Sequence, residues 1–322
     1  QLAVPHRREP LQLLVWQPAQ PRAGAPWLLL SPGLGGSSAQ LEWLAAALVE
    51  RGWSVLLLEH PGSDEVAMRG WLEGRRPPPA AETLGDRLQD LQAVVAGVQS
   101  GPLPRLGSSV VLVGHSLGAV SSLMAAGLRP EPGLQRRCDR ALDALPLSNL
   151  SRLLQCQLAE VPLPPPVPLA QPVAAVVSLN GFGSLLWPQH GLQPLRVPVL
   201  LMGGSLDLIT PPLSEQLRLF LPQADSRSRL VLLQGGSHFS PVRIRPGNQA
   251  LFQLGEELVG VDPARIQALI LSLSSDFLQR VSHPGLGGML PQRRQLAGIT
   301  AYVLDRSHAL QWLEQTRLPA AN

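Results

Sequence analysis

The sequence contains no lysine: all 26 of its Lys and Arg residues are arginines, in a chain of 322 residues. This excludes catalysis through a lysine Schiff base, and it excludes a P-loop, which needs a lysine to hold phosphate. The arginines are scattered and form no run interleaved with aromatic residues. A bias toward arginine codons explains them better than nucleic-acid binding does, so we expect no nucleic-acid partner.

Long apolar runs and cysteines are also scarce. No apolar stretch approaches the roughly 20 residues that a membrane span needs. The sequence opens on Gln1 without a basic and then apolar leader, which is typical of a processed or trimmed chain. The two cysteines, Cys138 and Cys156, have no Cys or His neighbours at the spacing of a zinc site. They are either two buried thiols or one local disulfide, and a disulfide would imply an oxidising compartment.

The remaining composition, 45% hydrophobic and 15% charged, is that of one large globular domain. Apolar runs typical of buried strands alternate with segments of helical periodicity, which indicates an α/β fold with a mostly parallel sheet covered by helices on both faces. The expected strands span 11–16, 25–31, 53–60, 172–181, 198–207 and 228–238, with a further strand ending at 114. We expect the first two to pair antiparallel. The expected helices span about 37–52, 83–99, 117–128, 212–220 and 307–317, with another that begins at Asp262 and Pro263.

Residues 129–171 interrupt this alternation with proline-rich stretches around two helical pieces. Their position between two expected sheet strands predicts an inserted helical cap. The core domain is then expected to comprise residues 1–128 and 172–322.

The stretch "VVLVGHSLGAV" carries the most specific chemical signal. Gly114 to Gly118 fit the G-x-S-x-G pattern, in which a serine occupies a strained turn between a strand and a helix. The pattern alone is weak in a glycine-rich chain and could be an ordinary tight turn. The apolar strand directly before it and the helical segment directly after it are the context that the pattern requires, so we predict that Ser116 is a nucleophile.

A serine hydroxyl needs a base, and the base needs a carboxylate to orient it. Asp207 ends one expected strand and His238 ends the next. The chain order Ser, Asp, His is that of α/β-hydrolases. Alternatives are a structural role for His238 and a helix-capping role for Asp207. The ordered set favours catalysis without metal or cofactor.

Two N–H donors are expected to stabilise the oxyanion: those of Leu34, in "SPGLGGSS", and Leu117. Phe182 and Trp187 follow a strand and are candidates to line a substrate pocket, although core packing explains them equally well. His60 ends an expected strand and could line the site, but shaping the following Pro-Gly turn is the expected role.

The chain resembles bacterial α/β-hydrolases described as predicted dienelactone hydrolases, which are similar to platelet-activating-factor acetylhydrolases and related lipases. The likeness covers about residues 10–245 and rests on "LLLSPGLGGSS", "LLLEHPGSD", "LVGHSLGA", "RCDRALDALPLSNLSRLLQCQL", "VPVLLMGGSLDLITPP" and "LLQGGSHFS". Two positions depart from it. Pro32 stands where relatives have histidine, and Ser116 stands where true dienelactone hydrolases have cysteine, so lactone hydrolysis is not expected.

The resemblance implies that Cys138 and Cys156 form a disulfide in the cap and that the protein is exported to the periplasm or beyond, with a cytoplasmic location still open. It implies a serine esterase or lipase acting on small or polymeric hydrophobic esters, with transient contact to lipid surfaces and no obligate protein partner. Alternatives are a polyester hydrolase, a thioesterase or acyltransferase that uses the same three residues, and a binding protein that has lost catalysis.

Overall fold

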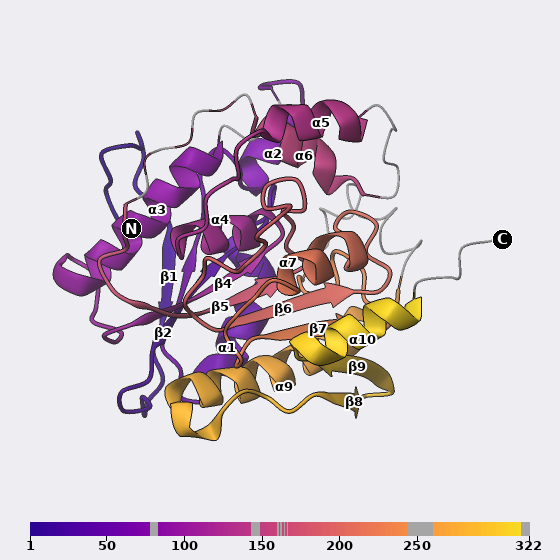
Figure 1. Ribbon diagram of the computed structural model, residues 1–322. Coiled ribbons are helices and arrows are strands. Elements are labelled where there is room, and N and C mark those ends of the chain that lie inside the picture. Colours follow the sequence, from indigo (N-terminus) through magenta and orange to yellow (C-terminus); the bar gives the residue numbers. More distant parts are fainter. Residues whose placement is uncertain are drawn as a thin grey trace.

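A central sheet of nine strands runs through the molecule (Figure 1). The computed structural model describes residues 1–77, 83–142, 149–159, 161, 163, 165, 167–243 and 260–316. The strands are β1 (Leu13–Trp16), β2 (Trp27–Ser31), β3 (Val55–Leu58), β4 (Val110–His115), β5 (Val173–Leu179), β6 (Val199–Gly204), β7 (Arg229–Leu233), β8 (Gln292–Leu296) and β9 (Ile299–Leu304). Their order in space is β1-β3-β2-β4-β5-β6-β7-β9-β8. Strands β2 to β7 pair parallel, which confirms the predicted sheet.

Helices cover both faces of this sheet. They are α1 (Glu42–Val49), α2 (Glu65–Leu72), α3 (Thr83–Ser100), α4 (Leu117–Ala125), α5 (Leu134–Leu142), α6 (Ser151–Gln157), α7 (Arg218–Phe220), α9 (Pro263–Ser282) and α10 (Arg306–Thr316), with short turns η1 (Ser38–Gln40), η2 (Leu213–Leu217) and η3 (Pro284–Leu286). Leu28 and Leu30 pack with α1 and α9 on one face, whereas Leu29 packs with α3 on the other. This alternation is the two-residue period of a strand, and it explains why every residue of β2 is buried.

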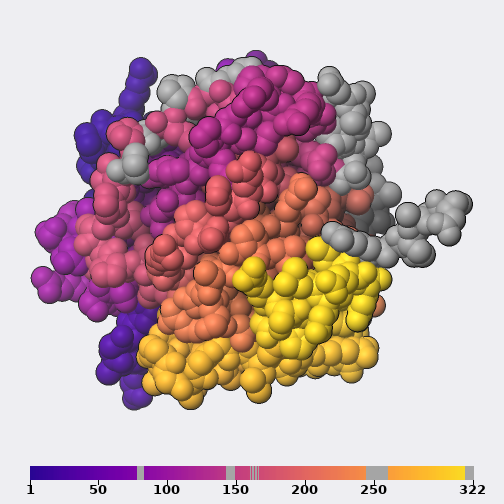
Figure 2. Space-filling model, in the orientation of Figure 1, coloured from indigo at the N-terminus to yellow at the C-terminus, as the bar shows by residue number. Residues whose placement is uncertain are grey.

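Helices α5 and α6 lie between α4 and β5 in the chain and form one end of the visible face (Figures 1 and 2). A disulfide joins Cys138 of α5 to Cys156 of α6, with their Cα atoms 5.4 Å apart. The fully buried carboxylate of Glu215 accepts hydrogen bonds from Asn149 Nδ2 (2.6 Å) and the Gly183 N–H (2.8 Å). This carboxylate therefore ties the start of α6 to the core.

The predicted cap of residues 129–171 contains both of these helices. Its residues 143–148, 160, 162, 164 and 166 lie outside the described residues. The division of the chain into cap and core stays a prediction.

The expected antiparallel pairing of the first two strands is wrong. Strand β1 pairs with β3, with Leu13 opposite Leu58, and β2 lies between β3 and β4. The physical reason is burial: β2 is covered on both faces and suits the interior of the sheet, whereas the partly exposed β1 suits an edge.

The β8–β9 hairpin was not predicted from the sequence. Its turn is formed by Ala297 (φ 52°) and Gly298 (φ 72°), both in the left-handed region, rather than by the Asn-Gly pair that normally signals such a turn. The predicted start of α9 is confirmed, because Asp262 Oδ1 accepts the Ala264 N–H at 2.9 Å and Pro263 is the first helical residue. In the part of the chain that the structure describes, no helix has the length and apolar character needed to cross a membrane.

Candidate active site

Ser116 occupies a sharp turn between β4 and α4. Its backbone has φ 52° and ψ −119°, a conformation that is strained for any residue with a side chain. Gly114 and Gly118 make the turn possible: a Cβ atom on Gly114 would lie 2.2 Å from the Gly118 carbonyl oxygen, and one on Gly118 would lie 2.2 Å from the Ser31 carbonyl oxygen. The two glycines of the pattern are therefore required by backbone packing at both positions.

The structure brings the three residues predicted as nucleophile, base and acid into one chain of hydrogen bonds. Ser116 Oγ lies 3.0 Å from His238 Nε2, and His238 Nδ1 lies 2.9 Å from Asp207 Oδ2. Exposure falls along this chain, from 9% for Ser116 to 5% for His238 and 2% for Asp207. The serine is thus the member closest to solvent, and the carboxylate is the most enclosed.

Asp207 follows β6 and accepts hydrogen bonds from the turn after it, but the next helical segment, η2, has Pro212 as its N-cap, so the helix-capping alternative is wrong. Its Oδ1 accepts the backbone N–H groups of Ile209 (2.9 Å) and Thr210 (2.7 Å), and its Oδ2 accepts the Thr210 hydroxyl (2.6 Å) beside His238. Burial alone would raise the pKa of this carboxyl group, but attraction to His238 and the hydrogen bonds from His238 and Thr210 lower it below its usual value. The carboxylate is therefore held ionised while facing the imidazole.

Three further residues contact this hydrogen-bonded set and were not predicted to do so from the sequence. Thr210 Oγ1 also lies 3.2 Å from His238 Nδ1, and the side-chain amide of Asn180 donates to the His238 carbonyl oxygen at 3.0 Å. His115 precedes Ser116 in the turn, and its Nε2 is 2.9 Å from the same carbonyl oxygen. Burial and the neighbouring His238 lower the pKa of His115 to about 3, so its ring is neutral. The spacing of three between Asp207 and Thr210, typical of a carboxylate turn, was the one available signal.

The loop that contains Leu34 lies directly against the serine. A Cβ atom on Gly33 would be 3.2 Å from Ser116 Cβ and 3.1 Å from His115 Nδ1. The backbone N–H groups of Leu34 and Leu117 donate to no acceptor within the described parts of the chain. Two unused donors therefore lie in the segments that border Ser116, as a site for an oxyanion requires.

Phe182 and Trp187 are both buried in the core that α4 forms with its neighbours. The indole N–H of Trp187 donates to the Arg129 carbonyl oxygen at 2.8 Å. This placement is what the core-packing alternative expects, and a contact of either ring with substrate stays a prediction.

A second hydrogen-bonded set of serine, histidine and aspartate begins at Ser31, just before the Leu34 loop. Ser31 Oγ is 2.8 Å from His60 Nε2, and His60 Nδ1 is 2.9 Å from Asp90 Oδ2. All three side chains are fully buried. His60 thus does more than shape the turn that follows it, which was the role expected from the sequence.

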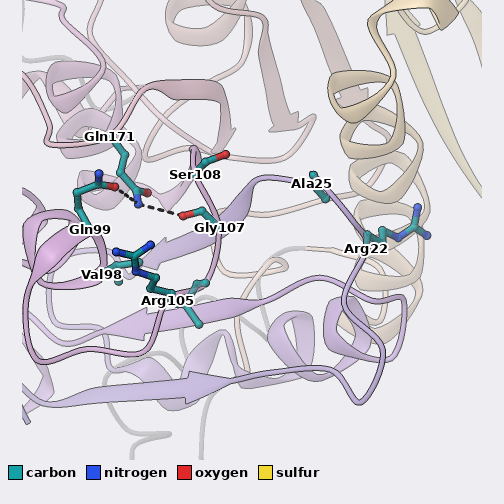
Figure 3. Close-up of a pocket in the computed structure, with 10 residues that line it drawn as sticks. Arg22, Ala25, Val98, Gln99, Arg105, Gly107, Ser108 and Gln171 are labelled. Carbon is teal, nitrogen blue, oxygen red and sulfur yellow. Dashed lines mark hydrogen bonds between the residues drawn. The ribbon is translucent and has the colours of Figure 1, made fainter.

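A hollow of about 520 Å³ lies near the amino ends of β2 and β4 (Figure 3). It is lined by Arg22, Ala25, Arg105 and Ser108, which precede β2 and β4 in the chain, and by Gln171. Ligands of open α/β sheets bind at the carboxyl ends of the strands, where Ser116 lies, so this hollow is not the candidate active site. Among the described residues no group of three or more His, Cys, Asp or Glu side chains could hold a metal ion, and the metal-free site stays a prediction.

Comparison with known proteins agrees with this architecture. No curated protein gives a match to the chain. A family model described as the alpha/beta hydrolase family matches residues 28–246, about two thirds of the chain, from β2 to beyond His238. The mostly parallel sheet and the serine turn after β4 agree with that match. The chain therefore belongs to the alpha/beta hydrolase family.

Proposed function

We propose that this hydrolase acts on carboxylic esters, with Ser116 as nucleophile, His238 as general base and Asp207 as the residue that orients the base. The observation that carries the proposal is the hydrogen-bonded chain Ser116–His238–Asp207, whose serine sits on a strained turn beside the unused N–H groups of Leu34 and Leu117. A serine held in this way is poised to attack rather than only to pack.

The acylation step follows from these distances. Ser116 Oγ attacks the ester carbonyl carbon while His238 Nε2, 3.0 Å away, takes its proton. The carbonyl oxygen becomes an oxyanion that accepts hydrogen bonds from the Leu34 and Leu117 N–H groups, each worth about 10²- to 10³-fold in kcat. The intermediate then collapses, the alcohol leaves with the proton from His238, and the acyl group stays on Ser116.

The deacylation step repeats the same chemistry with water. His238 Nε2 takes a proton from the water as its oxygen attacks the acyl carbon, and the second tetrahedral intermediate uses the same two donors. The Ser116 oxygen leaves with the proton held by His238, and the carboxylic acid is released. The ionised Asp207 stabilises the imidazolium that forms in both steps.

Exposed leucines favour a hydrophobic ester as substrate. Five of them lie on the loop around Asp207 and on the adjoining start of α6, which meet where the Ser151 N–H donates to the Ile209 carbonyl oxygen. These leucines are Leu150, Leu153, Leu206, Leu208 and Leu213. Lipid esters and aromatic polyesters are within this class, and transient contact with a lipid surface is consistent with the same residues. We also propose that the protein belongs to the esterase-lipase group, similar to platelet-activating-factor acetylhydrolases, that its sequence resembles.

A fluorophosphonate probe and an ester panel test this proposal. The probe should modify the peptide that contains Ser116, as mapped by mass spectrometry, and should not modify a Ser116→Ala variant. p-Nitrophenyl esters from acetyl to palmitoyl should be hydrolysed by the wild type alone. Unchanged turnover by a folded Ser116→Ala variant overturns the assignment.

The remaining alternatives use the same assay. A thioesterase or acyltransferase would prefer a thioester substrate, or an alcohol or thiol as acyl acceptor over water. A protein that only binds ligands would leave the fluorophosphonate unreacted.

Export is proposed on the disulfide between Cys138 and Cys156. Protein isolated from its native host in the presence of a thiol-blocking reagent should contain no alkylated cysteine. Alkylation of both residues would contradict export to an oxidising compartment.

A further inference from the structure

Arg87 is a fully buried arginine that the proposed mechanism does not use. It lies on α3, and its Nε donates to Ser63 Oγ at 2.8 Å. Its Nη1 donates to the Pro32 carbonyl oxygen at 2.8 Å, and its Nη2 donates to the Gly33 carbonyl oxygen at 2.9 Å. Burial lowers the pKa of this guanidinium to about 9, so it remains charged at neutral pH. Burying a charge is costly, which makes the location of its acceptors informative.

The acceptor of Nη2 belongs to the same peptide unit as the proposed oxyanion donor. The Gly33 carbonyl and the Leu34 N–H share one planar amide, and in a trans peptide they point in opposite directions. Holding the Gly33 oxygen toward Arg87 therefore directs the Leu34 N–H away from Arg87. Gly33 lies against Ser116, so this orientation decides whether the donor faces the reacting carbonyl.

The other side of the loop is held by the segment after β3. The Gly35 N–H donates to the Ser63 carbonyl oxygen at 2.8 Å, and Gly36 forms a bridge with Asp64. Ser63 thus contacts both Arg87 and the Leu34 loop. The loop is fixed on both sides of Leu34, and its charged anchor is Arg87.

We propose that Arg87 is a positioning residue of the oxyanion hole, which fixes the Gly33–Leu34 peptide so that its N–H faces the developing oxyanion. This inference rests on the proposed function. Arg87 does not touch substrate and acts only through the peptide. The effect should therefore appear in the stabilisation of the transition state, because a flipped peptide would present an oxygen where a donor is needed.

The test compares Arg87→Gln and Arg87→Lys with variants of a second buried arginine. Arg229, the first residue of β7, also donates to backbone carbonyls, those of Ser226, Ser228 and Met289. Both Arg87 variants should lower kcat on p-nitrophenyl butyrate by about 10- to 100-fold, with KM within about threefold. Arg229→Gln and Arg229→Lys should lower thermal stability and leave kcat unchanged.

A second readout separates positioning from general damage. An alkyl trifluoromethyl ketone adds to Ser116 and places an oxyanion in the hole, whereas the matching methylene compound, which lacks the carbonyl, only occupies the pocket. Arg87→Lys should weaken the ketone by the same factor as kcat/KM and leave the affinity of the methylene compound unchanged.

Three results overturn the inference: a folded Arg87 variant with wild-type kcat and ketone affinity, equal losses for both inhibitors, or equal losses of kcat in the Arg229 variants. If Arg87→Gln does not fold, Arg87→Lys decides by the same criteria, supported by Ser63→Ala. This variant removes the Nε acceptor together with the hydrogen bond from Ser63 Oγ to the His60 carbonyl oxygen, and it leaves the Nη acceptors of Pro32 and Gly33 in place. If wild type itself fails to react with the fluorophosphonate, the proposed function fails instead.

Discussion

The residues that the structure describes include two hydrogen-bonded Ser–His–Asp sets with nearly the same distances. In the pair Ser116–His238 the distance is 3.0 Å, and in Ser31–His60 it is 2.8 Å. Both histidines lie 2.9 Å from their aspartates. Only the set that contains Ser116 is proposed to be catalytic. Under that proposal, the hydrogen bonds among serine, histidine and aspartate do not by themselves make the serine reactive.

Backbone position is the first difference. Ser31 is the last residue of β2, opposite Gly114 in the sheet, and it is fully enclosed. Ser116 is one strand away, on the strained turn that follows β4, and it keeps some exposure. An ester can approach the turn beside the unused N–H groups, whereas nothing can approach a serine inside the sheet.

Charge around the carboxylate is the second difference. Asp90 accepts hydrogen bonds from Arg7 Nε at 3.0 Å and from Arg7 Nη2 at 2.6 Å, so its charge is matched by the Arg7 guanidinium. Asp207 is held by neutral donors, and its carboxylate charge is left for His238. Burial and the charge of Arg87 lower the pKa of His60 to about 4, so that ring resists protonation. The hydrogen-bond distances alone therefore do not make His60 a general base.

Replacing each of the two serines by alanine should give the largest difference in kcat between the two sets. Ser116→Ala should lower kcat on p-nitrophenyl butyrate by about 10⁴-fold or more and leave the melting temperature nearly unchanged. Ser31→Ala should change kcat by at most about tenfold but lower the free energy of unfolding by about 1–3 kcal/mol, because the buried His60 Nε2 loses its hydrogen-bond partner while Nδ1 keeps Asp90. Comparable kcat losses in both variants would mean that the two chains are not functionally distinct.

Replacing each of the two aspartates by asparagine tests the same difference between the two sets. Asp207→Asn should lower kcat by about 10³- to 10⁴-fold, because the amide favours the wrong tautomer of His238. Asp90→Asn should instead cost about 3–5 kcal/mol of unfolding free energy, since it leaves Arg7 without its buried partner. Urea unfolding followed by circular dichroism measures the second effect, and a stable but inactive Asp90→Asn would contradict the structural role.

The buried histidines predict how stability depends on pH. His60 and His115 have pKa values lowered to about 4 and about 3 in the folded protein, against about 6.5 when unfolded. Between these values the unfolded chain binds more protons than the folded chain. The contribution of the two histidines to the free energy of unfolding is therefore fully present above about pH 6.5 and decreases as the pH falls toward 4. The slope should reach up to about 1.4 kcal/mol per pH unit for each histidine. His60→Gln should reduce the slope by roughly half, and an unchanged slope would refute the contribution of His60.

The smallest effect on kcat is expected at Thr210, whose neutral hydroxyl donates to Asp207. Thr210→Val removes the hydroxyl that donates to Asp207, and kcat should fall by about tenfold at nearly constant KM. The matched control is Thr300→Val, in β9, which should leave kcat unchanged. Equal activity in both variants would show that Thr210 does not orient the carboxylate.

Much of this arrangement was predictable because it depends on local patterns. Apolar runs predicted the parallel strands, Asp262 and Pro263 predicted the start of α9, and the glycines around Ser116 predicted the turn. The antiparallel edge strands escaped prediction because their pairing depends on partners distant in the chain and because Ala297 replaces the usual turn residue. Thr210 and Asn180 escaped because a hydrogen bond between loops leaves no periodic signal.

The sequence by itself determined the fold class and the residue types of the proposed site, since strand period, turn glycines and chain order are local properties. Only the tertiary structure decided which Ser–His–Asp set lies on a strained and accessible turn and which is enclosed with its charge already matched. It also brought Arg87 onto the peptide of Leu34. These outcomes depend on contacts between segments that lie 29 to 122 residues apart in the sequence, which tertiary packing sets and no local pattern records.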